Sequence, residues 1–164
     1  MGAKIKTWQK WLLGAFVTTL IIGGGAAVSF KVRGLRNNNP GNIRVSRSDW
    51  KGKVPSDLNT DGAFEQFYNA EDGIRALARV LLTYYNRGTN TIRKMINVYA
   101  PPIENDSDSY VNSVSVSTGI NADRVYPADK VPELVRAIIT HENGLNPYRD
   151  ETITRAVQRA GWNA

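Results

Sequence analysis

Apolar residues recur at intervals of three and four along most of the chain after residue 69, which is the pattern of helices with one buried face. This spacing predicts helices over 70–86, 91–99 and 151–160. The first of them is the longest and most regular. Pro101 and Pro102 end the second, because proline has no backbone N–H and cannot continue a helix.

Two more helices are indicated by their end signals. One begins at Asn105 or Asp106, whose side chains can cap a helix N-terminus, and closes at Gly119. The other covers 129–143 and is followed by Gly144, a glycine in the position that favours a left-handed turn after a helix.

Residues 34–62 lack helical spacing and are rich in Asn, Gly, Asp, Ser and Pro, with short apolar pairs such as Ile43 and Val45. This composition predicts turns and short strands. We therefore predict that residues 34–164 form one α+β domain that is mainly α, with one small β region and no internal repeat.

An apolar segment precedes this domain. Residues 11–30 (WLLGAFVTTLIIGGGAAVSF) carry no charge, and about 20 such residues are enough to cross a membrane as a helix. We interpret residues 1–33 as a signal anchor with a transmembrane helix, only weakly held because Gly and Ala are frequent in it. The alternative is a cleaved signal peptide, with Ala27-Val28-Ser29 as its cleavage region. Either interpretation puts the domain outside the cytoplasm.

The charge distribution argues against nucleic-acid binding. The formal net charge is +6, but Lys4, Lys6, Lys10, Lys31 and Arg33 flank the apolar segment and leave only +1 for the remainder. A nucleic-acid interface normally needs clustered Lys and Arg on the folded domain. The chain has no Cys, so disulfides, thiolate metal sites and thiol catalysis are excluded.

His141 is the only histidine, which argues against a zinc enzyme, because most protein zinc sites use more than one His or Cys. The chain also has no Gly-x-Ser-x-Gly motif and no Walker lysine. We therefore expect no metal and no cofactor. His141 itself is interpreted as a favourable cation at the C-terminus of a helix.

Glu142 is the carboxylate that the helical pattern singles out. Val131, Val135, Ile138 and Glu142 follow one another at spacings of four, three and four, so the carboxyl lies on the apolar stripe of its helix. Burial and the negative end of the helix dipole should both raise its pKa, which suits a general acid. The alternative is that Glu142 turns outward and is solvated, as lone helical glutamates usually are.

Two other polar segments are less specific. Glu104, Asn105 and Asp106 fit a helix N-cap with acidic first-turn residues as well as they fit a site. Residues 36–42 (RNNNPGN) form a turn by composition, and their functional interpretation is a set of amide groups for sugar hydroxyls and N-acetyl groups.

Four segments of the chain together resemble a known family. They are RGLRNNNPGNIR (33–44), FEQFYNAEDGIRALARVLLTYY (64–85), YAPPIENDSDSYVNSV (99–114) and AIITHENGLNPY (137–148). They are similar to phage- and prophage-encoded lysozyme-like proteins, described as endolysins or virion-associated murein-cleaving proteins. The resemblance covers nearly all of residues 33–160 and implies a lysozyme-like domain.

A second resemblance concerns the site. The segment ENGLNPY from Glu142 is similar to the Glu-Ser-x-Phe-Asn-Pro motif of soluble lytic transglycosylases, whose Glu is the sole acid and base. Their later Glu-Thr-Arg-x-Tyr-Val motif resembles the stretch from Glu104 to Tyr110 and Val111. In those enzymes the order is reversed, so this chain would be a circularly permuted relative. It departs from the family in having Asn143 in place of Ser and no Gly-Leu-Met-Gln motif.

The resemblance implies an enzyme that cleaves the β-1,4 bond between N-acetylmuramic acid and N-acetylglucosamine in peptidoglycan. Glu142 would be its catalytic residue, and Asn39, Asn42, Glu104 and Tyr110 would bind the glycan. Lysozyme and lytic transglycosylase both remain open, since Glu104 or Asp61 could hold a water. The alternative is a non-catalytic virion or wall-binding protein with the same fold. The expected location is the inner membrane with the domain in the periplasm, or the virion, where virion proteins would be further partners.

Overall fold

The computed structural model describes residues 32–101 and 106–162, and within these ranges the chain is mainly helical, as predicted. The predicted membrane segment, residues 11–30, lies outside the described residues. The helices in order are α1 (Arg33–Arg36), α2 (Ala70–Asn86), α3 (Ile92–Tyr99), α4 (Ser107–Thr118), the 3₁₀ turn η2 (Ala128–Lys130), α5 (Val131–Asn143) and α6 (Asp150–Arg159).

The helices begin where side-chain caps are available. The side chains of Asn69, Thr91 and Asp106 accept hydrogen bonds from the backbone of the first turns of α2, α3 and α4. Of the two caps predicted for α4, Asp106 is the one used. Gly119 and Gly144 take left-handed conformations (φ 69° and 74°) directly after α4 and α5, which confirms both predicted ends.

The predicted β region is much smaller than expected. In the described part of the chain it consists of isolated antiparallel bridges, such as Arg44 with Phe64 and Lys53 with Phe67, and no longer strand is formed there. Scattered backbone hydrogen bonds, such as the one from the N–H of Glu65 to the carbonyl of Ile43, link these loops, and the side chain of Asn38 adds a bond to the carbonyl of Phe67. The short helix α1 was also missed, because four residues are too few to show a helical period.

Helix α5 lies at the centre of the fold. It packs against α1, α2, α4 and α6, and the apolar positions predicted to face inward are fully buried. These positions are Val131, Leu134, Val135, Ile138 and Ile139. A helix surrounded on several sides needs a wide apolar face, and this explains why the stripe of α5 is so regular.

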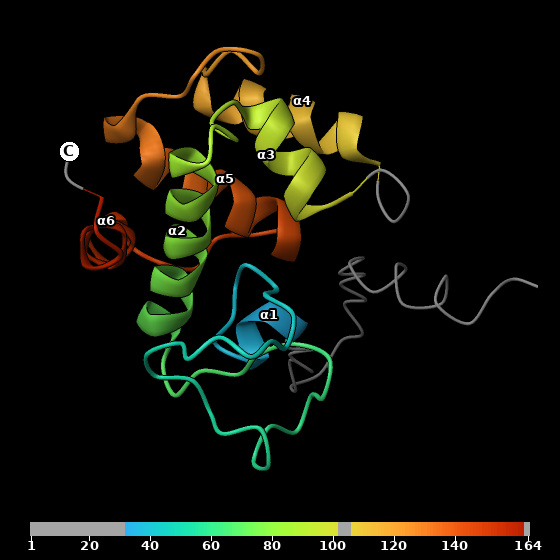
Figure 1. Ribbon diagram of the computed structural model, residues 1–164, viewed down its shortest axis with the longest axis vertical. Helices are drawn as coiled ribbons and strands as arrows, with labels where there is room; N and C mark the ends of the chain where they lie inside the picture. The colour runs from blue at the N-terminus through green and yellow to red at the C-terminus, as the bar shows by residue number, and fades with distance from the viewer. Residues whose placement is uncertain (1–31, 102–105, 163–164) are drawn as a thin grey trace, which may run out of the picture.

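Figure 1 shows the arrangement that positions the site. Helices α3 and α4 form one end of the molecule, and α1 with the loops before α2 forms the other end. Helix α5 crosses the middle, and its C-terminal end lies between these two parts. None of the helices in the described ranges is both long and apolar enough to cross a membrane.

Candidate active site around Glu142

Glu142 is the second-to-last residue of α5, and it faces two different parts of the fold at once. Its Oε2 accepts a hydrogen bond from Nδ2 of Asn42, in the loop after α1, at 2.9 Å. Its Oε1 accepts one from the hydroxyl of Tyr110, on α4, also at 2.9 Å. The structure therefore brings together three of the residues that the sequence singled out, from positions up to 100 residues apart.

The surroundings of Glu142 raise its pKa. The cause is burial, which disfavours the charged carboxylate, while the hydrogen bonds from Asn42 and Tyr110 pull the pKa the other way and are weaker. The direction agrees with the sequence-based prediction. A carboxyl group with a raised pKa keeps a proton at higher pH, which a general acid requires.

Two tyrosines share this buried environment. Burial raises the pKa of Tyr99 and of Tyr110 well above the ordinary value, and the nearby charge of Glu142 adds to the effect. Both phenols therefore stay protonated and act as hydrogen-bond donors. The hydroxyl of Tyr99 donates to the carbonyl of Gly41, next to Asn42, so α3 also helps to hold this loop. Tyr99 was not among the residues expected at the site.

His141 contacts the site through Tyr110. The two rings are stacked, with centroids 3.5 Å apart and planes 13° apart. Desolvation lowers the pKa of His141, which favours the neutral imidazole. The lowered pKa disfavours the predicted cation at the helix C-terminus, because one face of the ring is desolvated against Tyr110 although the residue is exposed at the surface.

The loop that carries Asn42 is held in an unusual backbone conformation. Asn38 and Asn42 have φ values of 50° and 49°, in the left-handed region that Asn tolerates better than most residues. The side chain of Asn39 is wholly buried and bonds to the backbone of Ile43 and Glu65. The amide of Asn39 therefore bonds to the protein backbone and is not exposed to a substrate, contrary to the substrate-binding role predicted for it.

Asn143 ties the same loop to the end of α5. Its Nδ2 donates to the carbonyl of Pro40 at 2.7 Å and to that of Ile139 at 2.8 Å, and the side chain is almost fully buried. The Oδ1 atoms of Asn143 and Asn42 both face Gly34 of α1, where a Cβ would lie 2.4 and 3.0 Å from them. Gly34 is thus required for the close approach of α1.

Of the other predicted residues, Glu104 lies outside the described residues. Asp61, considered as a holder of water, is instead surrounded by cations. Its Oδ2 lies 3.0 Å from Nη2 of Arg36, 2.9 Å from Nδ2 of Asn37 and 3.3 Å from Nε of Arg33. Burial works against ionisation, but these donors and the backbone N–H groups of residues 63 and 64 outweigh it and lower the pKa of Asp61. This carboxylate is a structural one.

The loop-rich part also contains a buried carboxylate that the sequence did not reveal. The side chain of Glu65 is 1% exposed and accepts hydrogen bonds from Ser46 and Lys53. In the sequence, the only indication that Glu65 is buried is its position between Phe64 and Phe67, and this indication is weak.

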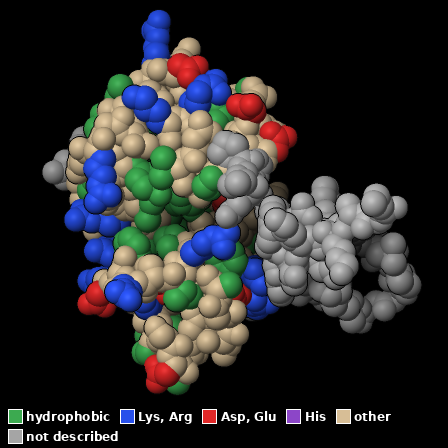
Figure 2. Space-filling model, turned by 45° about the vertical axis from the view of Figure 1, so that its right-hand side comes forward, with side chains coloured by type: hydrophobic (Ala, Val, Ile, Leu, Met, Phe, Trp, Pro, Cys, Tyr) green, Lys and Arg blue, Asp and Glu red, His purple; other side chains and the backbone are tan. Residues whose placement is uncertain are grey.

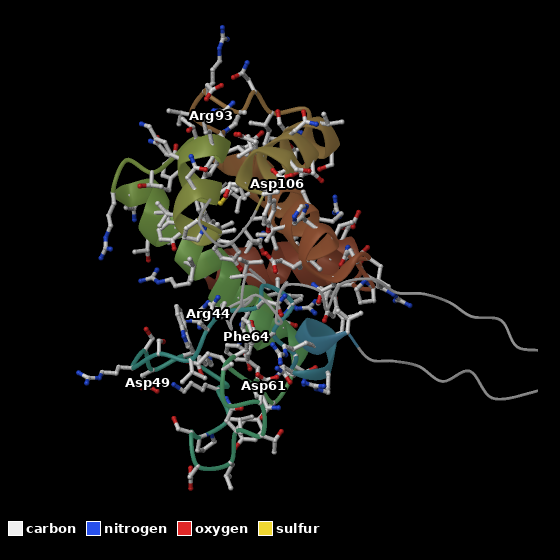
Figure 3. The ribbon with its side chains drawn as sticks, turned by 90° about the vertical axis from the view of Figure 1, so that its right-hand side faces the viewer. Arg44, Asp49, Asp61, Phe64, Arg93 and Asp106 are labelled. Carbon is white, nitrogen blue, oxygen red and sulfur yellow. The ribbon has the colours of Figure 1, made fainter. Side chains whose placement is uncertain are left out.

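Figure 3 shows this part of the molecule, with Phe64 next to Arg44 and Asp61 nearby. Phe64 lies under the guanidinium groups of Arg33 and Arg44, at 5.0 and 5.6 Å from its ring centroid.

Figure 2 shows the surface between the two parts. Hydrophobic side chains gather in the middle of this face, where the surface is hollowed, and Lys and Arg side chains border them. Such a face suits an amphipathic ligand with anionic groups. In the ranges 32–101 and 106–162, no group of three or more His, Asp or Glu side chains is placed to hold a metal ion.

The comparisons with known proteins give one informative result. No family model matches the chain. The chain is similar to protein P5 of Pseudoalteromonas phage PM2, with 39% identity over 130 residues that cover 77% of this chain and 80% of that protein.

Proposed function

The chain belongs to the family of protein P5 of Pseudoalteromonas phage PM2, and we propose that it is a phage-encoded enzyme that cleaves the β-1,4 bond between N-acetylmuramic acid and N-acetylglucosamine in peptidoglycan. The observation that carries the proposal is the single carboxyl group of Glu142, buried enough to raise its pKa and hydrogen-bonded on both oxygens. The phage relative agrees with the phage origin of the family that the sequence resembles.

In the proposed reaction Glu142 donates its proton to the glycosidic oxygen. The bond between that oxygen and C1 of the muramic acid breaks, and its electron pair stays on the leaving oxygen. The carboxylate left behind is stabilised by the donors of Asn42 and Tyr110. In the described ranges no second carboxylate is hydrogen-bonded into this site. We therefore favour the substrate-assisted route over attack by a held water: the C6 hydroxyl attacks C1 and closes a 1,6-anhydro ring, and its proton passes to the Glu142 carboxylate.

The test uses the full chain purified in detergent and incubated with insoluble sacculi. Glu142→Gln should abolish the release of soluble muropeptides detected by mass spectrometry, while circular dichroism stays unchanged. Glu133→Gln is the matched control, because Glu133 is on the same helix and pairs with Lys130 at the surface. Undiminished release by the Glu142 variant would end the proposal. Products with 1,6-anhydro ends identify a transglycosylase, and reducing ends identify a lysozyme.

A second candidate is a non-catalytic wall-binding or virion protein. One observation favours it: both oxygens of Glu142 are already occupied by protein donors, so this carboxyl also acts as a tie between α4, α5 and the loop after α1. Sedimentation with sacculi distinguishes the two functions. Binding of the wild-type chain without any released muropeptide supports the non-catalytic candidate.

For location, we propose that residues 11–30 tether the domain to the inner membrane, with the domain in the periplasm or on the virion. The tether is weak by composition, since Gly and Ala contribute far less to insertion than Leu. Replacing Gly23, Gly24 and Gly25 by Leu should fix the protein in the membrane fraction and delay lysis. A native protein recovered as a shorter chain beginning near Phe30 would show a cleaved signal instead.

A further inference from the structure

The two oxygens of Glu142 have partners of different chemical kinds. Oε2 faces Nδ2 of Asn42, an amide nitrogen that can only donate. Oε1 faces the hydroxyl of Tyr110, which can donate or accept. When the carboxyl is ionised both contacts are satisfied. When it is protonated, its hydrogen can form a hydrogen bond only toward Tyr110.

The orientation of the Asn42 amide is fixed by its other side. Its Oδ1 is buried against Gly34 and has no hydrogen-bond partner among the described residues. A flipped amide would turn the two-proton Nδ2 group toward Gly34 and give up the hydrogen bond to Glu142. A buried carbonyl without a partner is tolerated more often than a buried N–H. The flipped amide would also place its oxygen against the Glu142 carboxylate.

We propose that Asn42 is a positioning residue that keeps the transferable proton of Glu142 on Oε1, the oxygen beside Tyr110. The expected effect on kcat rests on the proposed function. Which oxygen of Glu142 carries the proton does not, because it depends on the protein alone. The glycosidic oxygen must then approach from the side of Tyr110 and His141. Before substrate binds, the Tyr110 hydroxyl accepts a hydrogen bond from the protonated Oε1 of Glu142. The glycosidic oxygen of the substrate then takes the place of this hydroxyl.

The other groups facing Glu142 in the described residues do not offer a different acceptor. They are the phenols of Tyr110 on α4 and Tyr99 on α3, both of which stay protonated. The Tyr99 hydroxyl is used by the carbonyl of Gly41. His141 stacks face to face on Tyr110, and among the described residues no hydrogen bond joins its ring nitrogens to Glu142.

Two substitutions remove the amide donor and keep the backbone; Asn42→Asp also brings a second carboxylate toward Glu142, so Asn42→Gly is the decisive variant. Asn42→Asp has nearly the same shape, and Asn42→Gly removes the side chain; both residues accept the left-handed conformation at φ 49°. Asn38→Asp is the matched control, because Asn38 has the same conformation in the same loop but bonds to the carbonyl of Phe67.

The measurement is the pKa of Glu142, followed in the full chain by NMR of ¹³C-labelled carboxyl groups and assigned with Glu142→Gln. Both Asn42 variants should raise this pKa, and the Asn38 control should leave it unchanged. On sacculi, kcat should fall about tenfold or more while KM changes little, because the loss falls on the proton-transfer step. An unchanged pKa in Asn42→Gly overturns the inference, whether or not the wild type cleaves peptidoglycan. Absence of cleavage with a raised pKa overturns the proposed function alone.

Discussion

Asn143 donates from Nδ2 to the carbonyl oxygen of Pro40, and so joins the residue after the candidate acid to the loop that carries Asn42. The bond spans 103 residues of sequence and is buried. This bond explains why Asn is suited to position 143, where the similar transglycosylase motif has Ser. The side chain of Asn is longer than that of Ser and reaches the loop.

We expect Asn143→Ala to lower the free energy of unfolding by about 1–3 kcal/mol, because it leaves the buried carbonyl of Pro40 without a donor. Chemical denaturation monitored by circular dichroism measures the change. Asn112→Ala on the exposed face of α4 is the control and should stay within about 0.5 kcal/mol of wild type. Equal losses for the two variants would contradict the role given to Asn143.

Gly34→Ala should reduce activity as well as stability. The new Cβ would lie 2.4 Å from Oδ1 of Asn143, so α1 or the end of α5 must shift, at a cost of about 1–3 kcal/mol. The shift also displaces Asn42 from Glu142. Gly88→Ala is the control, because a Cβ there meets nothing within 4 Å and costs only left-handed strain, about 1–2 kcal/mol. Muropeptide release should fall in the first variant and persist in the second.

The pH dependence of stability should reveal the raised pKa of Glu142. Its ordinary value is 4.5, and the folded value is higher. Between these two values the folded state binds a proton that the unfolded state releases, so this group makes stability fall as pH rises. The wild type should therefore lose stability relative to the non-titrating Glu142→Gln variant as pH rises above about 4.5. A difference that stays constant with pH would contradict burial of this carboxyl.

Asp61→Asn should behave in the opposite way and leave catalysis intact. The pKa of Asp61 is lowered, so its contribution to stability is present above the unfolded value of 3.8 and is lost as pH falls through the folded value. At neutral pH the variant should be less stable by about 1.5–3 kcal/mol, because hydrogen bonds to a charged acceptor are weakened. Thermal melts at several pH values test this. Loss of muropeptide release without loss of stability would instead restore the water-holding role.

The helical part of the fold could be predicted because its signals are local. The apolar spacing of α5, the Thr91 cap of α3 and Gly144 after α5 each depend on a few neighbouring residues. The ends of the predicted and observed helices therefore differ by two residues at most.

The loop-rich part could not be predicted in the same way, because its bonds join residues far apart in the chain. Asn37 bonds to Asp61, and Asn39 to the backbone of Glu65. A run of asparagines looks the same in a sequence whether its amides face a ligand or the protein. For this reason the sequence pattern predicts a substrate contact for Asn39, and the expected strands are reduced to isolated bridges to which side-chain bonds are added.

For the site, the periodic stripe identified Glu142, and the resemblance added Tyr110. No sequence pattern pointed to Tyr99 or Asn143, because their contacts depend on the backbone carbonyls of Gly41 and Pro40, which face them in the fold. Every residue has the same backbone carbonyl, so contacts of this kind cannot be predicted from residue identity and are found only in the folded structure.

The distance in sequence between Asn42 and Glu142 has a consequence for the cell that makes the protein. Asn42 lies in the loop after α1, and Glu142 is synthesised 100 residues later. Contacts of such long range form late, after most of the chain is collapsed. A nascent or truncated chain therefore lacks the contact between Asn42 and Glu142, and the proposed peptidoglycan-degrading activity would arise only from finished molecules.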